Sequence, residues 1–207
     1  MSRSSIMDSK RAESYPLRRR EVVARLLEER GNLLVVSGLG ASSWDVTAAG
    51  DSPLTFPLWG AMGGAAMIGL GLALAQPERR VLVVTGDGEM LMGLGSLAVI
   101  GVKQPANLAI AVLDNERYGE TGMQATHTAG PVDLAAMAVG AGFPAVADVF
   151  DQAQLDEALP RLRGESGPVL VNIKVRAEEL PLALPPKDGV VLKQRFRAAL
   201  LGPGNPD

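Results

Sequence analysis

The sequence contains no cysteine among its 207 residues. This absence excludes disulfide bonds, zinc–thiolate sites and iron–sulfur clusters held by this chain, and it is compatible with a cytoplasmic location. Aromatic residues are also scarce, at 4%, and there is a single histidine, whereas glycine occurs 24 times. The core must therefore be built from aliphatic side chains and from close backbone contacts at glycine.

The chain also lacks a strong charge of either sign. Its 20 lysine and arginine residues nearly balance its 23 aspartate and glutamate residues, which leaves a net charge of −3. Such a weak field does not attract nucleic acid or an acidic membrane surface. One uncharged run, residues 57–75, has the length of a membrane span, but its five glycines and its place between two strand-like runs favour a buried helix. We therefore expect no nucleic-acid partner and no membrane segment.

Short aliphatic runs alternate with helix-compatible segments along most of the sequence. The expected strands are residues 33–36, 81–84, 108–113, 145–149 and 169–175. The expected helices are residues 17–30, 60–75, 89–102, 132–140 and a segment capped by Asp151, while residues 51–56 and 116–130 resemble loops. Continuous aliphatic strands that alternate with helices predict a single α/β domain, a doubly wound parallel sheet with helices on both faces. We expect a disordered leader (1–16), this domain (17–178), and a C-terminal arm (179–207) that is extended and ends in a short helix.

Two of the predicted strands end in residues that could bind a metal ion. One strand ends in Gly86-Asp87-Gly88, and the next ends in Asp114-Asn115, so that Asp87 and Asn115 lie 28 residues apart. This is about the length of one strand–helix–strand unit, which brings both side chains to the same edge of the sheet. A carboxylate and an amide oxygen suit Mg²⁺, which keeps positions open for phosphate oxygens. The sequence has no Walker motif, and Gly38-Leu39-Gly40 lacks the third glycine of a dinucleotide-binding fingerprint.

Gly86-Asp87-Gly88 followed by Asn115 resembles the cofactor motif of thiamin diphosphate-dependent enzymes. The stretch Gly60-Ala61-Met62-Gly63 resembles the one that precedes this motif in acetolactate synthases and related decarboxylases. Residues 118–127 look most similar to phosphonopyruvate decarboxylase and to the β subunit of sulfopyruvate decarboxylase. The resemblance covers roughly residues 20–175 and implies the thiamin diphosphate-binding fold of a diphosphate-binding (PP) domain.

The resemblance also implies roles for individual residues. Asp87, the amide oxygen of Asn115 and the backbone carbonyl of Arg117 would hold Mg²⁺, and Met62 would wedge between the two rings of the bent cofactor. Glu89 departs from the Ser or Ala found in many relatives, so its side chain must point away from the diphosphate or be offset by the metal. The other cofactor-binding residues that the resemblance implies are Ser42, Ser43, Gly60, Ala61, Gly86, Gly88, Tyr118, Gly119 and Glu120.

His127, the only histidine, is the candidate catalytic residue. In a polar loop that follows the predicted metal-binding strand, it could donate a proton or anchor the substrate near neutral pH. A histidine in a surface loop with no catalytic role is an equally good interpretation.

The function that the resemblance implies is decarboxylation of a 2-oxo acid of the phosphonopyruvate or sulfopyruvate type, with thiamin diphosphate and Mg²⁺ as cofactors. In this family the activating glutamate lies on a separate pyrimidine-binding (PYR) domain, and the sequence outside residues 20–175 is too short to form one. We therefore expect a partner subunit that carries this glutamate, and an oligomeric cytoplasmic enzyme. The alternatives are an acetolactate synthase-like carboligase subunit, a thiamin-dependent oxidoreductase subunit and a non-catalytic scaffold subunit of the same fold.

Overall fold

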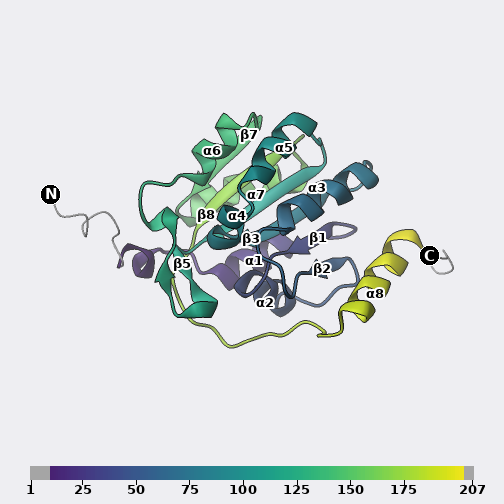
Figure 1. Cartoon of the computed structure of the whole chain (residues 1–207), viewed down its shortest axis with the longest axis horizontal. Coiled ribbons are helices and arrows are strands. Elements are labelled where there is room, and N and C mark those ends of the chain that lie inside the picture. The colour runs from purple at the N-terminus through teal and green to yellow at the C-terminus, as the bar shows by residue number, and fades with distance from the viewer. Residues whose placement is uncertain (1–9, 203–207) are drawn as a thin grey trace.

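The computed structural model describes residues 10–202, which form a six-stranded sheet between two layers of helices (Figure 1). All strand pairings in this sheet are parallel. In spatial order the strands are β2 (Thr55–Pro57), β1 (Leu34–Ser37), β3 (Val81–Gly86), β4 (Leu108–Asp114), β8 (Val169–Lys174) and β7 (Ala145–Val149). The predicted doubly wound α/β fold is thus confirmed.

Helices cover both faces because successive residues of each strand point to opposite sides. On β3, Leu82 and Val84 belong to one aliphatic core, and Val81 and Val83 belong to the other. The first core is closed by α1 (Arg19–Leu27), α2 (Ala41–Ala48) and α7 (Gln152–Gly164). The second is closed by α3 (Ala65–Ala75), α4 (Asp87–Met92), α5 (Gly95–Lys103), α6 (Leu134–Gly140) and α8 (Gly189–Leu201). In Figure 1, α3 and α5 lie in front of the sheet and α7 behind it.

Two of the predicted helices have different limits in the structure. The helix expected over residues 60–75 begins only at Ala65, because Gly63 adopts a left-handed backbone conformation with φ of 84°. The helix expected over residues 89–102 begins earlier, at Asp87, and is divided at Gly93 and Leu94 into α4 and α5. The stretch with the length of a membrane span therefore contains a helix of 11 residues. Within residues 10–202, no helix has both the length and the hydrophobicity needed to cross a membrane.

Two segments predicted as loops contain strands. Thr55 and Phe56, expected in the loop 51–56, belong instead to β2, a three-residue edge strand. The strand ends at Pro57, which is possible because an edge strand tolerates a residue without an N–H group. The longer segment, 116–130, folds into a two-stranded antiparallel sheet with short 3-10 turns. Its elements are β5 (Arg117–Tyr118), η3 (Gly119–Thr121), β6 (Gln124–Ala125) and η4 (His127–Ala129).

The two predicted flanking segments differ in outcome. Residues 1–9 of the predicted leader lie outside the described residues, but Arg11–Ser14 form the 3-10 helix η2, so this part does not fit the expected disorder. The C-terminal arm runs extended to α8, as predicted (Figure 1). Phe196 of α8 packs edge-to-face on Phe56 with ring centroids 5.5 Å apart, so the arm covers edge strand β2. The boundary between domain and arm at residue 178 stays a prediction.

Candidate functional site

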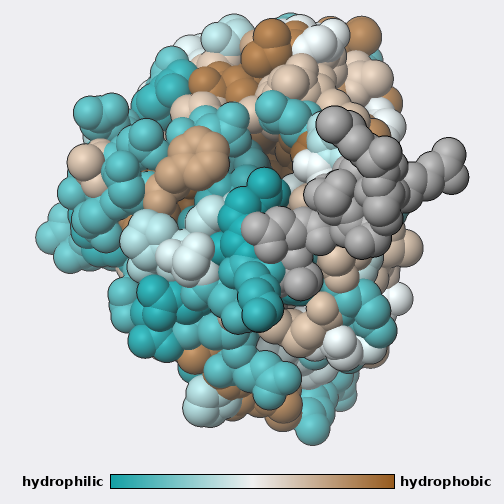
Figure 2. Space-filling view, turned by 90° about the vertical axis from the view of Figure 1, so that its left-hand side faces the viewer, coloured by the Kyte–Doolittle hydropathy of each residue, from teal (hydrophilic) through white to brown (hydrophobic). Residues whose placement is uncertain are grey.

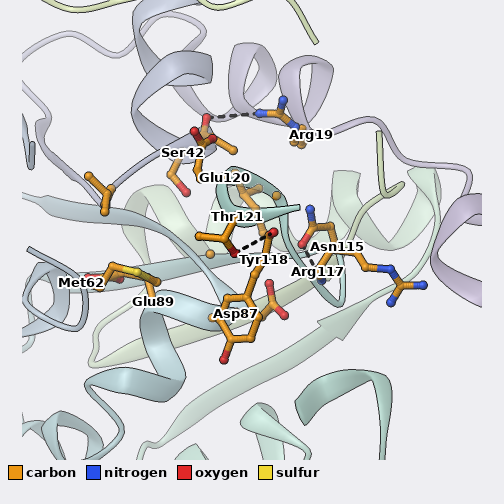
Figure 3. A pocket seen from close by; sticks show the side chains of 16 residues that line it. Arg19, Ser42, Met62, Asp87, Glu89, Asn115, Arg117, Tyr118, Glu120 and Thr121 are labelled. Atoms are coloured by element: carbon orange, nitrogen blue, oxygen red, sulfur yellow. Dashed lines mark hydrogen bonds between the residues drawn. The ribbon is translucent and has the colours of Figure 1, made fainter. Parts of the chain in front are cut away.

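A cavity of about 160 Å³ opens at the carboxyl ends of β1, β3 and β4 (Figure 3). The chain leaves β1 through α2 on one face of the sheet and leaves β3 through α4 and α5 on the other. Such a reversal of winding is the usual ligand site of an open α/β sheet. The side of the molecule at which β5 lies in Figure 1 carries many hydrophilic residues, with apolar ones gathered along its upper and right margins (Figure 2).

Most of the predicted site residues line this cavity. They are Ser42, Met62, Gly86, Asp87, Gly88, Glu89, Asn115, Arg117, Tyr118, Gly119 and Glu120. The sequence did not point to the other lining residues, which are Arg19, Leu39, Ala41, Leu113 and Thr121.

The remaining predicted residues lie outside the cavity lining. Ser43 is buried and donates a hydrogen bond to the carbonyl of Gly38 (2.7 Å), so of the two serines only Ser42 lines the cavity. Gly60 and Ala61 are exposed in the turn before Met62. His127 is exposed in η4. The roles of these residues stay predictions.

Asp87 is the most deeply buried carboxylate of the cavity, with 1% of its surface exposed. Its Oδ2 accepts hydrogen bonds from the hydroxyls of Thr126 and Thr128, and Thr128 also lies 2.8 Å from Oδ1 of Asp114. Burial and, secondarily, the charge of Asp114 raise the pKa of Asp87 to about 7. Asp87 thus resists ionisation, because it is buried beside a second carboxylate. A bound divalent cation would stabilise its ionised form.

The oxygen atoms around Asp87 fit a magnesium site. Asp87 follows the end of β3 and Asn115 follows the end of the neighbouring strand β4, and both line the cavity (Figure 3). The Asn115 Oδ1 accepts the N–H of Arg117 (3.0 Å) and keeps a second lone pair for a metal ion. The described residues contain no group of three or more His, Cys, Asp or Glu side chains that could bind a metal. A metal held here would thus depend on one carboxylate and neutral oxygens, a donor set that suits Mg²⁺.

The carboxylate of Glu89 is engaged by hydrogen-bond donors of the protein itself, and the two solutions expected for its charge stay predictions. Its Oε1 accepts the backbone N–H groups of Gly63 and Ala65, each at 3.0 Å, and its Oε2 accepts the hydroxyl of Thr85. The negative charge is therefore held by hydrogen-bond donors on the side of α3. Glu89 is nevertheless one of the residues that line the cavity.

The segment from β5 to η3 forms one wall of the cavity by packing on two glycines. A Cβ atom on Gly88 would lie 2.5 Å from Cε1 of Tyr118, and one on Gly40 would lie 2.8 Å from Cγ of Glu120. Both distances are shorter than van der Waals contact, so only glycine permits these approaches. Glu120 is held in place by Trp44, whose Nε1 donates to its Oε1 (3.1 Å).

A buried network of charges supports the turn that carries Asn115. The Nζ of Lys174 lies 2.7 Å from Asp114 and 3.0 Å from Glu116, and both carboxylates are fully buried. Glu116 also accepts hydrogen bonds from Tyr15 (2.7 Å) and Arg11 (2.6 Å). Burial alone would lower the pKa of Lys174, but the two carboxylates raise it above its usual value.

Sequence reasoning missed three kinds of supporting residue. The hydroxyls of Thr126 and Thr128 hold Asp87, and the only sequence signal was their spacing on either side of His127. Arg19 lines the cavity and forms an ion pair with the buried Asp45. It lies on α1, whose sequence pattern indicated only an amphipathic helix. The partners of Glu116 are distant in sequence, so no local pattern could reveal them.

Comparisons with known proteins agree with this geometry. Residues 40–173 match the family described as thiamine pyrophosphate enzyme, C-terminal TPP binding domain. The chain is 37% identical over 180 residues to sulfopyruvate decarboxylase subunit beta of Methanothermobacter thermautotrophicus, covering 87% of this chain and 94% of that protein. It is 39% identical over 194 residues to phosphonopyruvate decarboxylase of Streptomyces viridochromogenes, covering 93% of this chain but only 48% of that protein.

A solved structure shares the fold. The X-ray structure of a candidate thiamin diphosphate-dependent enzyme from Mycobacterium smegmatis superposes with a TM-score of 0.67 at 19% sequence identity. The match covers 79% of this chain and 32% of that one. It supports the sheet topology described above.

Proposed function

Because the chain belongs to the thiamine pyrophosphate enzyme family through its C-terminal TPP binding domain, we propose that it is the thiamin diphosphate- and Mg²⁺-binding subunit of a 2-oxo acid decarboxylase. The proposed substrates are of the phosphonopyruvate or sulfopyruvate type. The observation that carries the proposal is the buried Asp87, which together with Asn115 lines a cavity at the switch point of the sheet. A non-catalytic scaffold would gain nothing from burying such a carboxylate.

The residues of the cavity divide into groups that would bind different parts of the cofactor. Asp87, the Asn115 amide oxygen and the Arg117 carbonyl would hold Mg²⁺, which in turn binds the diphosphate. Ser42 and the backbone N–H groups of Gly88 and Glu89 would donate hydrogen bonds to the diphosphate oxygens. Gly86 leaves room for this approach, because a Cβ there would meet only atoms 4.0 Å away.

Met62 and Arg117 lie at opposite ends of the group of labelled residues in Figure 3. Met62 would support the ring portion of the cofactor. When bound, thiamin diphosphate supplies an electron sink for the electron pair released as the carboxylate of the 2-oxo acid departs. Tyr118, Gly119 and Glu120 would exclude water from one side of the site. His127, next to the two threonines that hold Asp87, is kept as the proposed proton donor or substrate anchor.

The extent of the matches supports a partner subunit. The chain spans about half of the phosphonopyruvate decarboxylase that it matches, but 94% of a protein named as a beta subunit. We infer that a second chain supplies the PYR domain with its activating glutamate, in a cytoplasmic oligomer. The site would then lie at the interface between the two chains.

The test is to purify the chain together with the product of the adjacent gene and to measure CO₂ release. Sulfopyruvate, phosphonopyruvate and pyruvate are compared as substrates, with and without thiamin diphosphate and Mg²⁺. We expect CO₂ release only when both chains and both cofactors are present, and loss of release with Asp87→Asn. Full activity of the single chain would contradict the two-chain proposal, and release of acetolactate from pyruvate would favour the carboligase.

A further inference from the structure

The side chain of Glu89 performs a task that differs from the diphosphate-binding role of its backbone. We propose that its carboxylate is a positioning residue, which fixes residues 60–64, the Met62 segment, against the cavity. This inference rests on the proposed function, because its consequence is selective binding of the thiamin rings. Figure 3 shows Met62 and Glu89 next to each other at one side of the cavity.

Glu89 acts as a cap for a helix to which it does not belong. The first N–H groups of α3 need acceptors, but Gly64 at the N-cap position has no side chain to offer one. The Oε1 of Glu89, on α4, accepts the N–H groups of Gly63 and Ala65 instead. A carboxylate is also favoured here because the N-terminus of a helix carries a partial positive charge.

The position of the carboxylate is itself fixed on its other side. Its Oε2 accepts the hydroxyl of Thr85 on β3, and the side chain is only 4% exposed. Gly38 leaves the space for this pair, because a Cβ at that position would lie 2.9 Å from Thr85 Oγ1 and 3.2 Å from Glu89 Oε2. The carboxylate therefore links the strand exits of the cavity to the start of α3.

The Met62 segment depends on this link because it has little stiffness of its own. It contains glycine at positions 60, 63 and 64, and Gly63 has φ of 84°. The segment also lies close to Gly93, where a Cβ would come within 2.2 Å of the carbonyl oxygen of Gly63. Met62 is 39% exposed, so packing of its own side chain fixes the segment only in part.

This arrangement predicts that Glu89 influences the two halves of the cofactor unequally. Inorganic diphosphate with Mg²⁺ needs only the Asp87 side of the cavity, whereas thiamin diphosphate also needs Met62. We expect Glu89→Ala to raise the Kd of thiamin diphosphate about tenfold, since it removes hydrogen bonds to a charged acceptor, and to change the Kd of inorganic diphosphate by less than about twofold. Glu89→Gln should restore binding, because its amide oxygen still accepts both N–H groups and its NH₂ can donate to Thr85.

A second measurement is made on the chain without any ligand. The methyl resonance of Met62 is assigned by Met62→Leu, and it is expected to shift and sharpen in Glu89→Ala as the segment becomes mobile. The same resonance should stay in place in Glu89→Gln, and that of Met137 on α6 serves as an internal control. This readout requires neither cofactor nor partner.

The outcomes separate this inference from the proposed function. Equal weakening of both ligands by Glu89→Ala, or an unchanged Met62 resonance, would overturn the positioning role alone. Tighter binding of inorganic diphosphate by Glu89→Ala would also overturn it, because it would show that Glu89 acts by repelling the ligand. If the wild-type complex binds neither ligand, the proposed function fails, while the Met62 resonance still decides whether Glu89 fixes the segment.

Discussion

The aromatic ring of Tyr118 lies against the α-carbon of Gly88, so closely that a Cβ on residue 88 would stand 2.5 Å from Tyr118 Cε1. Gly88 follows Asp87 at the start of α4, and Tyr118 belongs to β5. The contact therefore joins the two chain segments that are proposed to surround the metal and the diphosphate. The absence of a side chain at residue 88 decides how near these segments can come.

Gly88→Ala should weaken cofactor binding, because the new methyl group must push Tyr118 and the β5 segment out of place. We expect the Kd of thiamin diphosphate with Mg²⁺ to rise by at least about tenfold, which corresponds to about 1.4 kcal/mol, measured by calorimetry. Gly95→Ala is the matched control, because a Cβ there meets no atom within 4 Å. In the helix it should be neutral or stabilise by up to about 1 kcal/mol. Unchanged binding by Gly88→Ala would show that the Tyr118 contact does not shape the site.

Asp87→Asn should remove the stabilisation that Mg²⁺ and thiamin diphosphate give to the protein. At a ligand concentration of 100 times Kd, binding adds about 2.7 kcal/mol to the free energy of unfolding of the wild type. The ligand-free variant should be at least as stable as the wild type, because it no longer buries a carboxylate beside Asp114. Thermal unfolding with and without the ligands measures both effects.

Asp133→Ala provides the control for this experiment. Its side chain caps α6 by accepting the N–H of Ala136 (2.8 Å), so its loss should cost about 1 kcal/mol of stability. The shift on adding ligands should nevertheless persist. A ligand-induced shift that survives in Asp87→Asn would argue against Asp87 as the metal-binding carboxylate.

The parts of the fold that the sequence predicted are those that depend on local patterns. The aliphatic run of β3 and the glycines after it are visible in a few consecutive residues, and they locate Asp87 and Gly88 at a sheet edge. Asn115 follows from the same pattern one strand later. The resemblance of these motifs then assigned most residues that line the cavity.

What the sequence did not predict depends on contacts between distant segments. The division between α4 and α5 occurs where Gly93 meets the carbonyl of Gly63, 30 residues earlier. The direction of the Glu89 side chain is set by N–H groups of a preceding turn. No periodicity encodes such pairings, because they depend on which segments the completed sheet brings together.

The attachment of α8 should depend on pH through Asp51. Its carboxylate accepts two hydrogen bonds from Arg195 (2.6 and 2.9 Å), and this interaction lowers the pKa of Asp51 below its usual value. A lowered carboxyl pKa gives stability above the unfolded pKa, and this stability is lost as the pH falls through the folded pKa. Hydrogen exchange of the α8 amides, corrected for the intrinsic rate, should therefore accelerate as the pH falls below about 4, the usual pKa of an aspartate.

The effect on α8 should be small, below about 1 kcal/mol, because the pair is partly exposed to solvent. Asp51→Asn should make α8 protection lower at pH 6 and insensitive to pH over the same range. Glu165→Gln is the control, because its ion pair with Arg161 lies within one turn at the end of α7. If α8 protection depended on pH in Asp51→Asn as strongly as in the wild type, another titrating group would be responsible.

Lys174→Met should destabilise the protein far more than the loss of an exposed ion pair does. Its ammonium group is the cation between Asp114 and Glu116, and removing it leaves two buried carboxylates in close proximity. Breaking a buried pair in this way typically costs about 3–5 kcal/mol.

Urea unfolding measures this loss against Arg25→Met, whose exposed pair with Asp156 should contribute less than about 1 kcal/mol. A Lys174→Met variant no less stable than Arg25→Met would show that Arg11 and Tyr15 suffice to neutralise the network. If the expected loss is found, adding Asp114→Asn should recover part of it, because Asp114 loses its cationic partner in Lys174→Met whereas Glu116 keeps Arg11.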